Sequence, residues 1–380
     1  MCIVFLIQGH PRFKLVVAAN RDEYLDRPTQ RAHFWERVPH VLAGRDKAHE
    51  AQYHSLLVGG RGERDVHMSP PSARSAAAAA SSLQAAAAAG APPDEFGLGE
   101  THGTWMGMTR GGRFAVITNF REHPSKQSPT AKSRGFLVRD FLVHHHHKHH
   151  HHGADPAHQS PRDYARSLAP QLAHYNGFNL VVGDANGETW YTGNRATAEQ
   201  IRPLEPGHVY GLSNGELLLD NETWPKVIKG KELFAQALSE ARCSAPACIR
   251  TPSRLTASGC ADTVMAPHTH TQATSVRDLL DRLLAMLARS EPFPQDQLPP
   301  NMFNYDLEAA LSPICIERER LPARNYATRT HTVIIVDNND RVLFAEMDRF
   351  RHVPDAAHPD QRFVREDLLE VFEFDVEQGV

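Results

Sequence analysis

Short apolar runs separated by turn residues recur along this 380-residue chain and predict antiparallel β-hairpins. Residues 3–7 and 13–19 flank a turn around Pro11, and a later pair turns at Asn186-Gly187, a favoured hairpin dipeptide. The same pattern predicts further strands at 105–109, 114–119, 178–183, 188–192, 209–212, 332–336, 342–346 and 364–374.

Helical periodicity occupies the intervals between these runs. The clearest case is 274–288, whose apolar stripe consists of Val276, Leu279, Leu280, Leu283, Leu284, Met286 and Leu287. Further helices are predicted at 135–143, 161–174 and 222–239. Hairpins that alternate with helices favour sheets covered by helices over a doubly wound parallel sheet. We therefore expect an α+β fold.

Three low-complexity segments interrupt this pattern, at 62–99, 144–160 and 243–272. The first is rich in Ala, Ser, Pro and Gly, the second contains eight histidines in a run of nine residues, and the third scatters three cysteines and two histidines irregularly. Neither of the last two has the spacing of a selective metal site. The sequence predicts one domain over 1–380 with three inserts, and no metal centre.

Composition narrows the class of protein. The 41 basic and 45 acidic residues give a formal charge of −4, which argues against nucleic acid as a partner. Five cysteines without a Cys-x-x-Cys pair suggest a reducing compartment. No apolar run approaches the ~20 residues that cross a bilayer. We expect a cytoplasmic protein without a transmembrane segment, and Golgi or mitochondrial association remains an alternative.

The candidate catalytic residues lie near the N-terminus. If Met1 is removed, Cys2 carries both a thiol and the free α-amine, which titrates near ~7.7–8.0 and suits general-base work. The second apolar run then ends at Asn20-Arg21-Asp22-Glu23. The alternative interpretation of Cys2 is a small apolar residue that merely begins a buried strand.

Together with this motif, several blocks along the whole chain resemble the Asn-Arg-Asp-Glu (NRDE) family. The blocks include Leu42-Ala43-Gly44-Arg45-Asp46, Gly103-Thr104-Trp105-Met106-Gly107, Tyr175-Asn176-Gly177-Phe178-Asn179-Leu180, Tyr210-Gly211-Leu212-Ser213-Asn214, Trp224-Pro225-Lys226 and Thr328-Arg329-Thr330-His331-Thr332-Val333. The resemblance implies a role in Golgi organisation and protein secretion, through the handling of an intracellular lipid or haem. Haem would be cargo, and no cofactor is required.

The Cys2 start and its following hairpin also resemble the N-terminal-nucleophile hydrolases. That likeness implies an αββα sandwich of antiparallel sheets, with residue 2 at the edge of a cleft. Asp22 would then orient the terminal amine, and Arg21 would favour the thiolate. Alternatively, Asp22 and Glu23 bind local backbone or pair with Arg27.

Asparagines at strand ends are the predicted donors to a developing oxyanion, because an amide donates without adding charge. Asn119 and Asn176 are the catalytic candidates, and a turn or strand-end role is the alternative for each. The predicted ligand-binding residues are Asn20, Arg21, Asn179, Asn214 and Arg329. Arg329 would bind a carboxylate or phosphate, or else form a surface ion pair.

Two functions follow. The first is a protein that handles a lipid or haem in a cleft beside Cys2, where Cys2, His10 and His102 are the available axial ligands for haem. The second is an active N-terminal cysteine hydrolase that cleaves a C–N amide or an acyl thioester.

Overall fold

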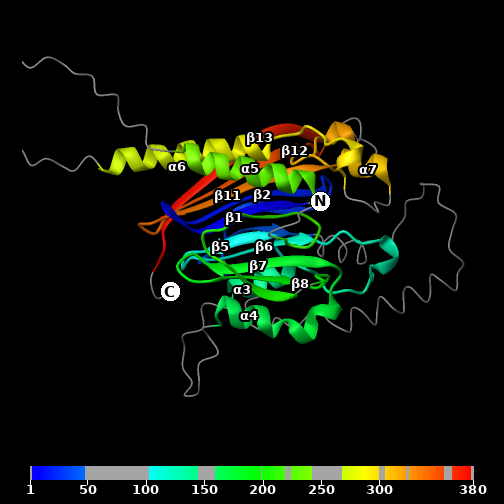
Figure 1. The fold of residues 1–380 in the computed structure, drawn as a ribbon, viewed down its shortest axis with the longest axis horizontal. Coiled ribbons are helices and arrows are strands. Elements are labelled where there is room, and N and C mark those ends of the chain that lie inside the picture. The colour runs from blue at the N-terminus through cyan, green and yellow to red at the C-terminus, as the bar shows by residue number, and fades with distance from the viewer. Residues whose placement is uncertain are drawn as a thin grey trace, which may run out of the picture.

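The computed structural model describes the chain as two β-sheets and their covering helices (Figure 1). The described residues are 2–47, 102–143, 159–197, 199–218, 224–241, 268–298, 304–321, 325–354 and 362–377. The predicted inserts lie outside these ranges, apart from residues 159–160 and 268–272. The last five are helical, because α6 begins at His268, inside the third predicted insert.

Six strands form the first sheet, in the order β10-β1-β2-β11-β12-β13. Every neighbouring pair is antiparallel. Both the N-terminal hairpin of β1 and β2 and the C-terminal hairpin of β11 and β12 were predicted. The bounds are Ile3–His10 for β1, Phe13–Tyr24 for β2, Tyr210–Leu212 for β10, Tyr326–Asp337 for β11, Arg341–His352 for β12 and Phe363–Asp375 for β13.

Seven strands form the second sheet, in the order β3-β4-β5-β6-β7-β8-β9, and this sheet is antiparallel throughout. The bounds are Thr29–Phe34 for β3, Val41–Asp46 for β4, Met106–Thr109 for β5, Arg113–Asn119 for β6, Phe178–Asp184 for β7, Thr189–Gly193 for β8 and Ile201–Leu204 for β9. Strands β3, β4 and β9 were not predicted.

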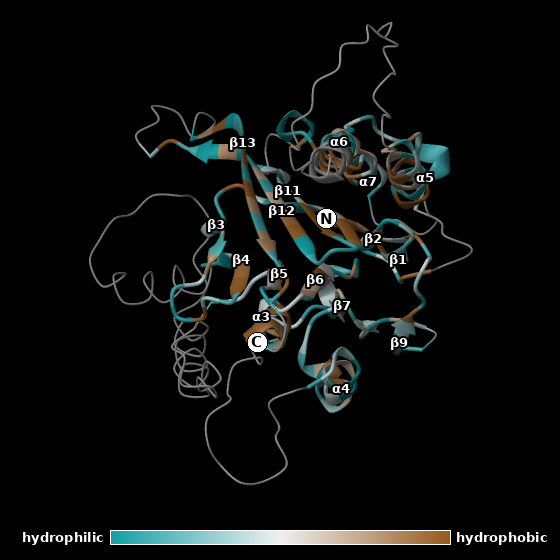
Figure 2. Ribbon diagram, turned by 90° about the vertical axis from the view of Figure 1, so that its left-hand side faces the viewer, coloured by the Kyte–Doolittle hydropathy of each residue, from teal (hydrophilic) through white to brown (hydrophobic). Residues whose placement is uncertain are grey.

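Helices cover the outer face of each sheet (Figures 1 and 2). Helices α5 (Pro225–Glu240) and α6 (His268–Leu287) pack on the first sheet, and α3 (Gly135–Val143) and α4 (Pro161–Ser167) pack on the second. The short helices are α7 (Tyr305–Ala310) and the 3-10 turns η1 (Pro124–Lys126), η2 (Ala169–His174), η3 (Gln295–Gln297) and η4 (Arg318–Arg320).

Local sequence explains where these helices begin. Pro225 opens α5 and Pro161 opens α4, and proline is favoured at the first helical position. The Ser160 hydroxyl accepts a hydrogen bond from the backbone N–H of Asp163 at 3.0 Å, which caps the start of α4. The Asn304 side chain caps α7 in the same way.

Strand alternation divides the core into layers. On β1, Val4 and Leu6 face the second sheet, whereas Ile3 and Phe5 face α5 and α6. Figure 2 shows the hydrophobic strands at the centre of the molecule, between the helical layers. The predicted αββα sandwich of antiparallel sheets is therefore confirmed.

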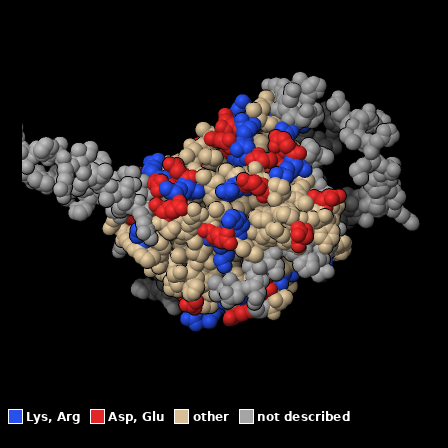
Figure 3. Space-filling view, turned by 45° about the horizontal axis from the view of Figure 1, so that its top comes forward, with Lys and Arg blue, Asp and Glu red and all other residues tan. Residues whose placement is uncertain are grey.

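The outer surface has both positive and negative side chains, and neither sign predominates. On the face drawn in Figure 3, basic and acidic side chains lie interspersed. Two of the ion pairs on the helical side join Arg282 to Glu240 at 2.5 Å and Arg341 to Glu373 at 3.3 Å. Among the residues that the structure describes, no helix is both long and apolar enough to cross a bilayer.

Candidate functional site

The ends of several strands meet at one end of the sandwich. Because Ile3 pairs with Asn20 across β1 and β2, Cys2 lies beside the Arg21-Asp22 end of β2. The Ser213 hydroxyl, just after β10, donates to the carbonyl of Cys2 at 2.9 Å. Asn119 is the last residue of β6. We call this region the open end of the sandwich, since it contains a pocket.

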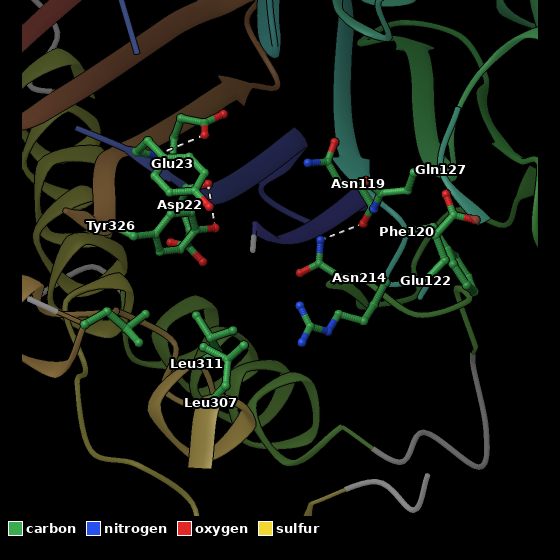
Figure 4. Close-up of a pocket in the computed structure, with 13 residues that line it drawn as sticks. Asp22, Glu23, Asn119, Phe120, Glu122, Gln127, Asn214, Leu307, Leu311 and Tyr326 are labelled. Atoms are coloured by element: carbon green, nitrogen blue, oxygen red, sulfur yellow. Dashed lines mark hydrogen bonds between the residues drawn. The ribbon is translucent and has the colours of Figure 1, made fainter. Parts of the chain in front are cut away.

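The pocket has a volume of about 260 Å³ and two different walls. Figure 4 shows Asp22 and Tyr326 on one side, Asn119 and Asn214 on the other, and two leucines of the α7 region below them. The lining residues are Asp22, Glu23, Tyr24, Asn119, Phe120, Arg121, Glu122, Gln127, Asn214, Leu307, Leu311, Leu321 and Tyr326. Charged and amide groups therefore face an apolar wall formed by the three leucines.

Cys2 is partly buried next to this pocket. It lines a narrow space between the sheets together with Arg21, Trp105 and Thr118. Burial raises the pKa of its thiol, and the positive charge of the amino terminus lowers it. The Asp22 carboxylate also raises this pKa, while a hydrogen bond from the Asp22 backbone and the charge of Arg21 lower it. The thiol is therefore protonated at neutral pH and needs a base to become a nucleophile.

Asp22 is the buried carboxylate of the site, with 4% of its surface exposed. Its Oδ1 accepts a hydrogen bond from the Thr328 hydroxyl at 2.6 Å, and its carbonyl accepts one from the Tyr326 hydroxyl at 3.0 Å. Burial raises the pKa of the Asp22 carboxyl, whereas the positive charges of the amino terminus and of Lys226 lower it. The structure thus places Asp22 where the sequence predicted, beside Cys2 and in the pocket.

Arg21 points to the opposite face of β2. Its guanidinium lies 4.1 Å from the centre of the Trp105 ring, between the two sheets. Glu23 and Asp46 lie 3.8 and 3.9 Å from its Nη2, and its Nη1 is buried without a hydrogen bond to the described residues. Arg21 therefore adds positive charge close to Cys2, and it does not line the larger pocket.

Two of the predicted ligand-binding asparagines hold backbone instead. Asn20 donates to the carbonyls of Leu287 and Ile314 at 2.9 and 2.8 Å, and its Oδ1 lies 2.6 Å from His331 Nδ1. Asn179 donates to the carbonyl of Gly215 at 2.8 Å and accepts from the Tyr191 hydroxyl at 2.7 Å. The Asn20 amide anchors the C-terminal end of α6, and the Asn179 amide anchors the loop after Asn214.

Two other predicted residues lie outside the pocket. The Asn176 amide pairs with the backbone N–H and carbonyl of Ser128 at 2.8 and 3.0 Å. The Arg329 guanidinium donates to the carbonyls of Leu25 and Arg27, with a distance of 2.5 Å to the latter. Both side chains fix loops, which for Asn176 is the turn role that its sequence position also allowed.

Asn119 and Asn214 lie next to each other in the pocket. The Asn214 amide donates to the carbonyl of Asn119 at 2.6 Å, and the Asn214 carbonyl accepts from the backbone N–H of Arg121 at 2.7 Å. The side chain of Asn119 is exposed in the pocket. Both asparagines line the pocket, and the Asn214 amide is hydrogen-bonded to the backbone of Asn119.

Charged residues that were not predicted complete the site. Arg121 pairs with the buried carboxylate of Glu308 on α7. Lys226, on α5, is 1% exposed and donates to the carbonyl of Leu311 at 3.2 Å. A signal for Lys226 was present, because helical spacing places it on one face with the buried Gly230 and Phe234. Within the described ranges, no group of three or more His, Cys, Asp or Glu could hold a metal ion.

The amino-acid sequence of this chain matches one protein family. The family model described as "Transport and Golgi organisation 2" matches residues 1–53 and 72–350. The "Transport and Golgi organization 2 homolog" of Mus musculus is 26% identical over 358 residues, which cover 91% of this chain and 92% of the homolog. The Bos taurus homolog is 26% identical over 360 residues, with coverage of 91% and 92%.

Among solved structures, penicillin V acylase from Agrobacterium tumefaciens is 13% identical. The superposition covers 98% of this chain and 86% of that chain, with a TM-score of 0.34. The assignment of the fold rests on the strand order of this chain.

Proposed function

The chain belongs to the Transport and Golgi organisation 2 family, also called the NRDE family, and from this premise we propose that it is an N-terminal cysteine hydrolase of acylated ligands. Its substrate would carry an amide or a thioester, and its action would serve Golgi organisation and secretion. The observation that carries the proposal is that Asp22 and Asn119 line one pocket, while Cys2 lies close to Asp22 in the adjoining space between the sheets.

The chemistry uses the chain's own N-terminus once Met1 is removed. The Cys2 sulfur bonds to the carbonyl carbon while its proton moves to the α-amine, which the Asp22 carboxylate orients. The Asn119 amide donates to the oxyanion. The departing amine or thiol then takes the proton from the α-ammonium as its bond to the carbonyl breaks. Water hydrolyses the acyl-Cys2 thioester to a carboxylic acid and restores the thiol.

The raised pKa of the Cys2 thiol is consistent with a mechanism in which the thiol is the nucleophile and the α-amine is the base. A protonated thiol is a poor nucleophile until a base removes its proton. An α-amine with a pKa near ~7.7–8.0 can do so at neutral pH. The apolar wall of Leu307, Leu311 and Leu321 is the surface on which an acyl chain would lie.

The test is to incubate the purified full chain with medium-chain acyl amides and acyl thioesters, followed by mass spectrometry of the N-terminal peptide. We expect loss of Met1 and an acyl adduct on Cys2. Cys2→Ser and Asp22→Asn should abolish the adduct. Cys315→Ser is the matched control and should keep it, because Cys315 is fully buried and its thiol pKa is raised to about 12. Retention of Met1 in the mature protein would exclude the proposal.

A carrier that binds without cleaving is the second candidate. It is favoured by the protonated state of the Cys2 thiol and by the apolar wall of the pocket. For haem as cargo, no His, Cys or Met is found among the described residues that line the pocket, and His10 lies at the far end of β1. If the protein is a carrier, Cys2→Ser should bind the acyl ligand as tightly as the wild type. Haem titration should give a Soret band that depends on Cys2, His10 or His102.

A further inference from the structure

Lys226 is a buried cation that the chemistry proposed for Cys2 does not use. It is the second residue of α5, after Pro225, and only 1% of its surface is exposed. Its Nζ donates to the carbonyl of Leu311 at 3.2 Å and lies 6.0 Å from the centre of the Trp224 ring. Within the described part of the chain it makes one hydrogen bond and no ion pair.

Burying the charged side chain of Lys226 is unfavourable for folding. Removing an ammonium from water without a direct carboxylate partner is unfavourable, and burial accordingly lowers the pKa of Lys226. A hydrophobic residue of similar length would fill the same space without that penalty. The presence of a charge here therefore points to a role for the charge itself.

The hydrogen bond of Lys226 connects it to the site, because Leu311 lines the pocket together with Asp22. The negative charges of Asp22 and of Glu308 on α7 raise the pKa of Lys226, whereas the charge of Arg121 lowers it. Asp22 responds in turn, because the positive charge of Lys226 lowers the pKa of its carboxyl. The two side chains thus influence each other through a buried, weakly screened region.

Arg349 is the other fixed cation near Asp22, and it is already paired. Its guanidinium is fully buried on β12 and donates to Glu317 at 2.7 Å, and its Nε lies 3.7 Å from Asp367. The amino terminus also acts on Asp22, but an α-amine that works as a base is neutral until it accepts the thiol proton, so its charge changes during the proposed reaction. Lys226 is thus the one cation near Asp22, among the described side chains, whose charge is neither paired nor changed in the proposed reaction.

We propose that Lys226 is a positioning residue that favours the ionised form of the Asp22 carboxylate beside Cys2. An ionised Asp22 can hold the α-amine in place throughout the reaction, whereas a neutral carboxyl would release it. The proposal rests on the role proposed for Cys2, but its test measures the coupling of Lys226 and Asp22 through unfolding. A failure of substrate turnover would therefore leave the result on Lys226 intact.

The test compares thermal unfolding of the full chain at pH 5 and pH 8 for wild type, Lys226→Met, Asp22→Asn and the double variant. Without Lys226, the folded state should hold a proton on Asp22 that the unfolded chain releases, so stability falls as the pH rises. We expect Lys226→Met to lose about 2–4 °C more in Tm at pH 8 than at pH 5, relative to wild type. In the Asp22→Asn background this difference should vanish.

Two variants separate charge from packing. Lys226→Arg keeps the charge and should show the wild-type pH profile. Lys229→Met removes an exposed lysine of the same helix, which pairs with Glu232 at 2.9 Å, and should also match the wild type. Lys226→Gln, which keeps a donor for the Leu311 carbonyl, serves if Lys226→Met does not fold. Equal losses at both pH values, with or without Asp22, would overturn the proposal.

Discussion

The two ends of the sandwich use the same strands in opposite ways. At the end opposite Cys2, which we call the closed end, Gln8 of β1 donates to the carbonyls of Asp184 and Gly187 at 2.7 and 2.9 Å. Its Oε1 accepts from the Thr189 hydroxyl at 2.6 Å, and Phe114 at the start of β6 is fully buried beside them. These neutral groups connect one sheet to the other, and at the same end Lys14 of β2 donates to Asn186 Oδ1 at 2.6 Å.

At the open end the same strands begin or end in ionisable and amide side chains. Cys2 precedes β1, Asp22 lies near the end of β2 and Asn119 ends β6. Buried carboxyl groups with raised pKa values are found here, which is costly for folding. The same strands therefore carry packing and neutral hydrogen bonds at one end and buried ionisable groups at the other, and substitutions at the two ends should have different effects.

The largest effect on stability should come from the closed end. Phe114→Ala removes a buried ring between the sheets, and we expect it to lower the free energy of unfolding by about 3–5 kcal/mol. Urea unfolding measures this loss. The rate of Cys2 alkylation by iodoacetamide, followed at the Cys2 peptide, should stay within twofold of wild type. A large change in that rate would show that the two ends are coupled.

A pH-dependent effect is expected inside the open end, at Glu346. Its carboxylate accepts from the backbone N–H of Ala32 on the other sheet at 2.7 Å, and burial raises its pKa from 4.5 to about 7. Asp348 and Glu370 also raise the pKa, and Arg21 lowers it. Because the folded protein binds the extra proton, this group's contribution to stability falls as the pH rises from about 4.5 to about 7, by roughly 3 kcal/mol.

Glu346→Gln should remove most of this pH dependence. Urea unfolding at pH 5 and pH 8 provides the measurement, and the variant should be the more stable protein at pH 8. Glu232→Gln is a matched control, because Glu232 is an exposed acid on α5. A wild-type pH slope in Glu346→Gln would contradict the assignment.

A smaller loss is expected for Gln8→Ala at the closed end. The substitution removes the hydrogen bonds that Gln8 makes to the carbonyls of Asp184 and Gly187 and to the buried hydroxyl of Thr189, and we expect a loss of about 1–3 kcal/mol in unfolding free energy. Thermal unfolding measures the loss. The acyl adduct on Cys2 should form at the wild-type rate.

The smallest effect on stability should come from Asn119→Ala. Its side chain is exposed in the pocket, so the free energy of unfolding should change by less than about 0.5 kcal/mol. If Asn119 donates to the oxyanion, formation of the Cys2 adduct should slow by about 10²–10³-fold. Asn176→Ala provides the comparison, since Asn176 pairs with Ser128 outside the pocket. Equal rates for the two variants would remove Asn119 from the proposed mechanism.

Sequence reasoning succeeded where the pattern is local. Alternating apolar runs around short turns identified the hairpins, and the proximity of Cys2 and Asp22 followed from one hairpin. Strand β3, with the sequence Thr-Gln-Arg-Ala-His-Phe, is an edge strand with little apolar character, and β9 contains Pro203. Such edge strands lack the apolar pattern from which the other strands were predicted.

The rest of the site could not be predicted because it depends on distant segments. Thr328, Glu308 and Lys226 contact the pocket residues Asp22, Arg121 and Leu311, respectively, from elements more than 200 residues beyond Asp22. Asparagines posed a different difficulty, since Asn119 and Asn176 look alike in sequence. Only the three-dimensional contacts of Asn176 with the Ser128 backbone reveal that its amide is occupied.

One backbone contact has a practical consequence for engineering. The N–H of Asp46 donates to the carbonyl of Gly103 at 2.8 Å, and β4 and β5 are neighbours in the second sheet. Residues 46 and 103 are therefore neighbours in the second sheet. A fluorescent reporter or a short Gly-Ser linker could be inserted between these two positions without changing the path of either strand.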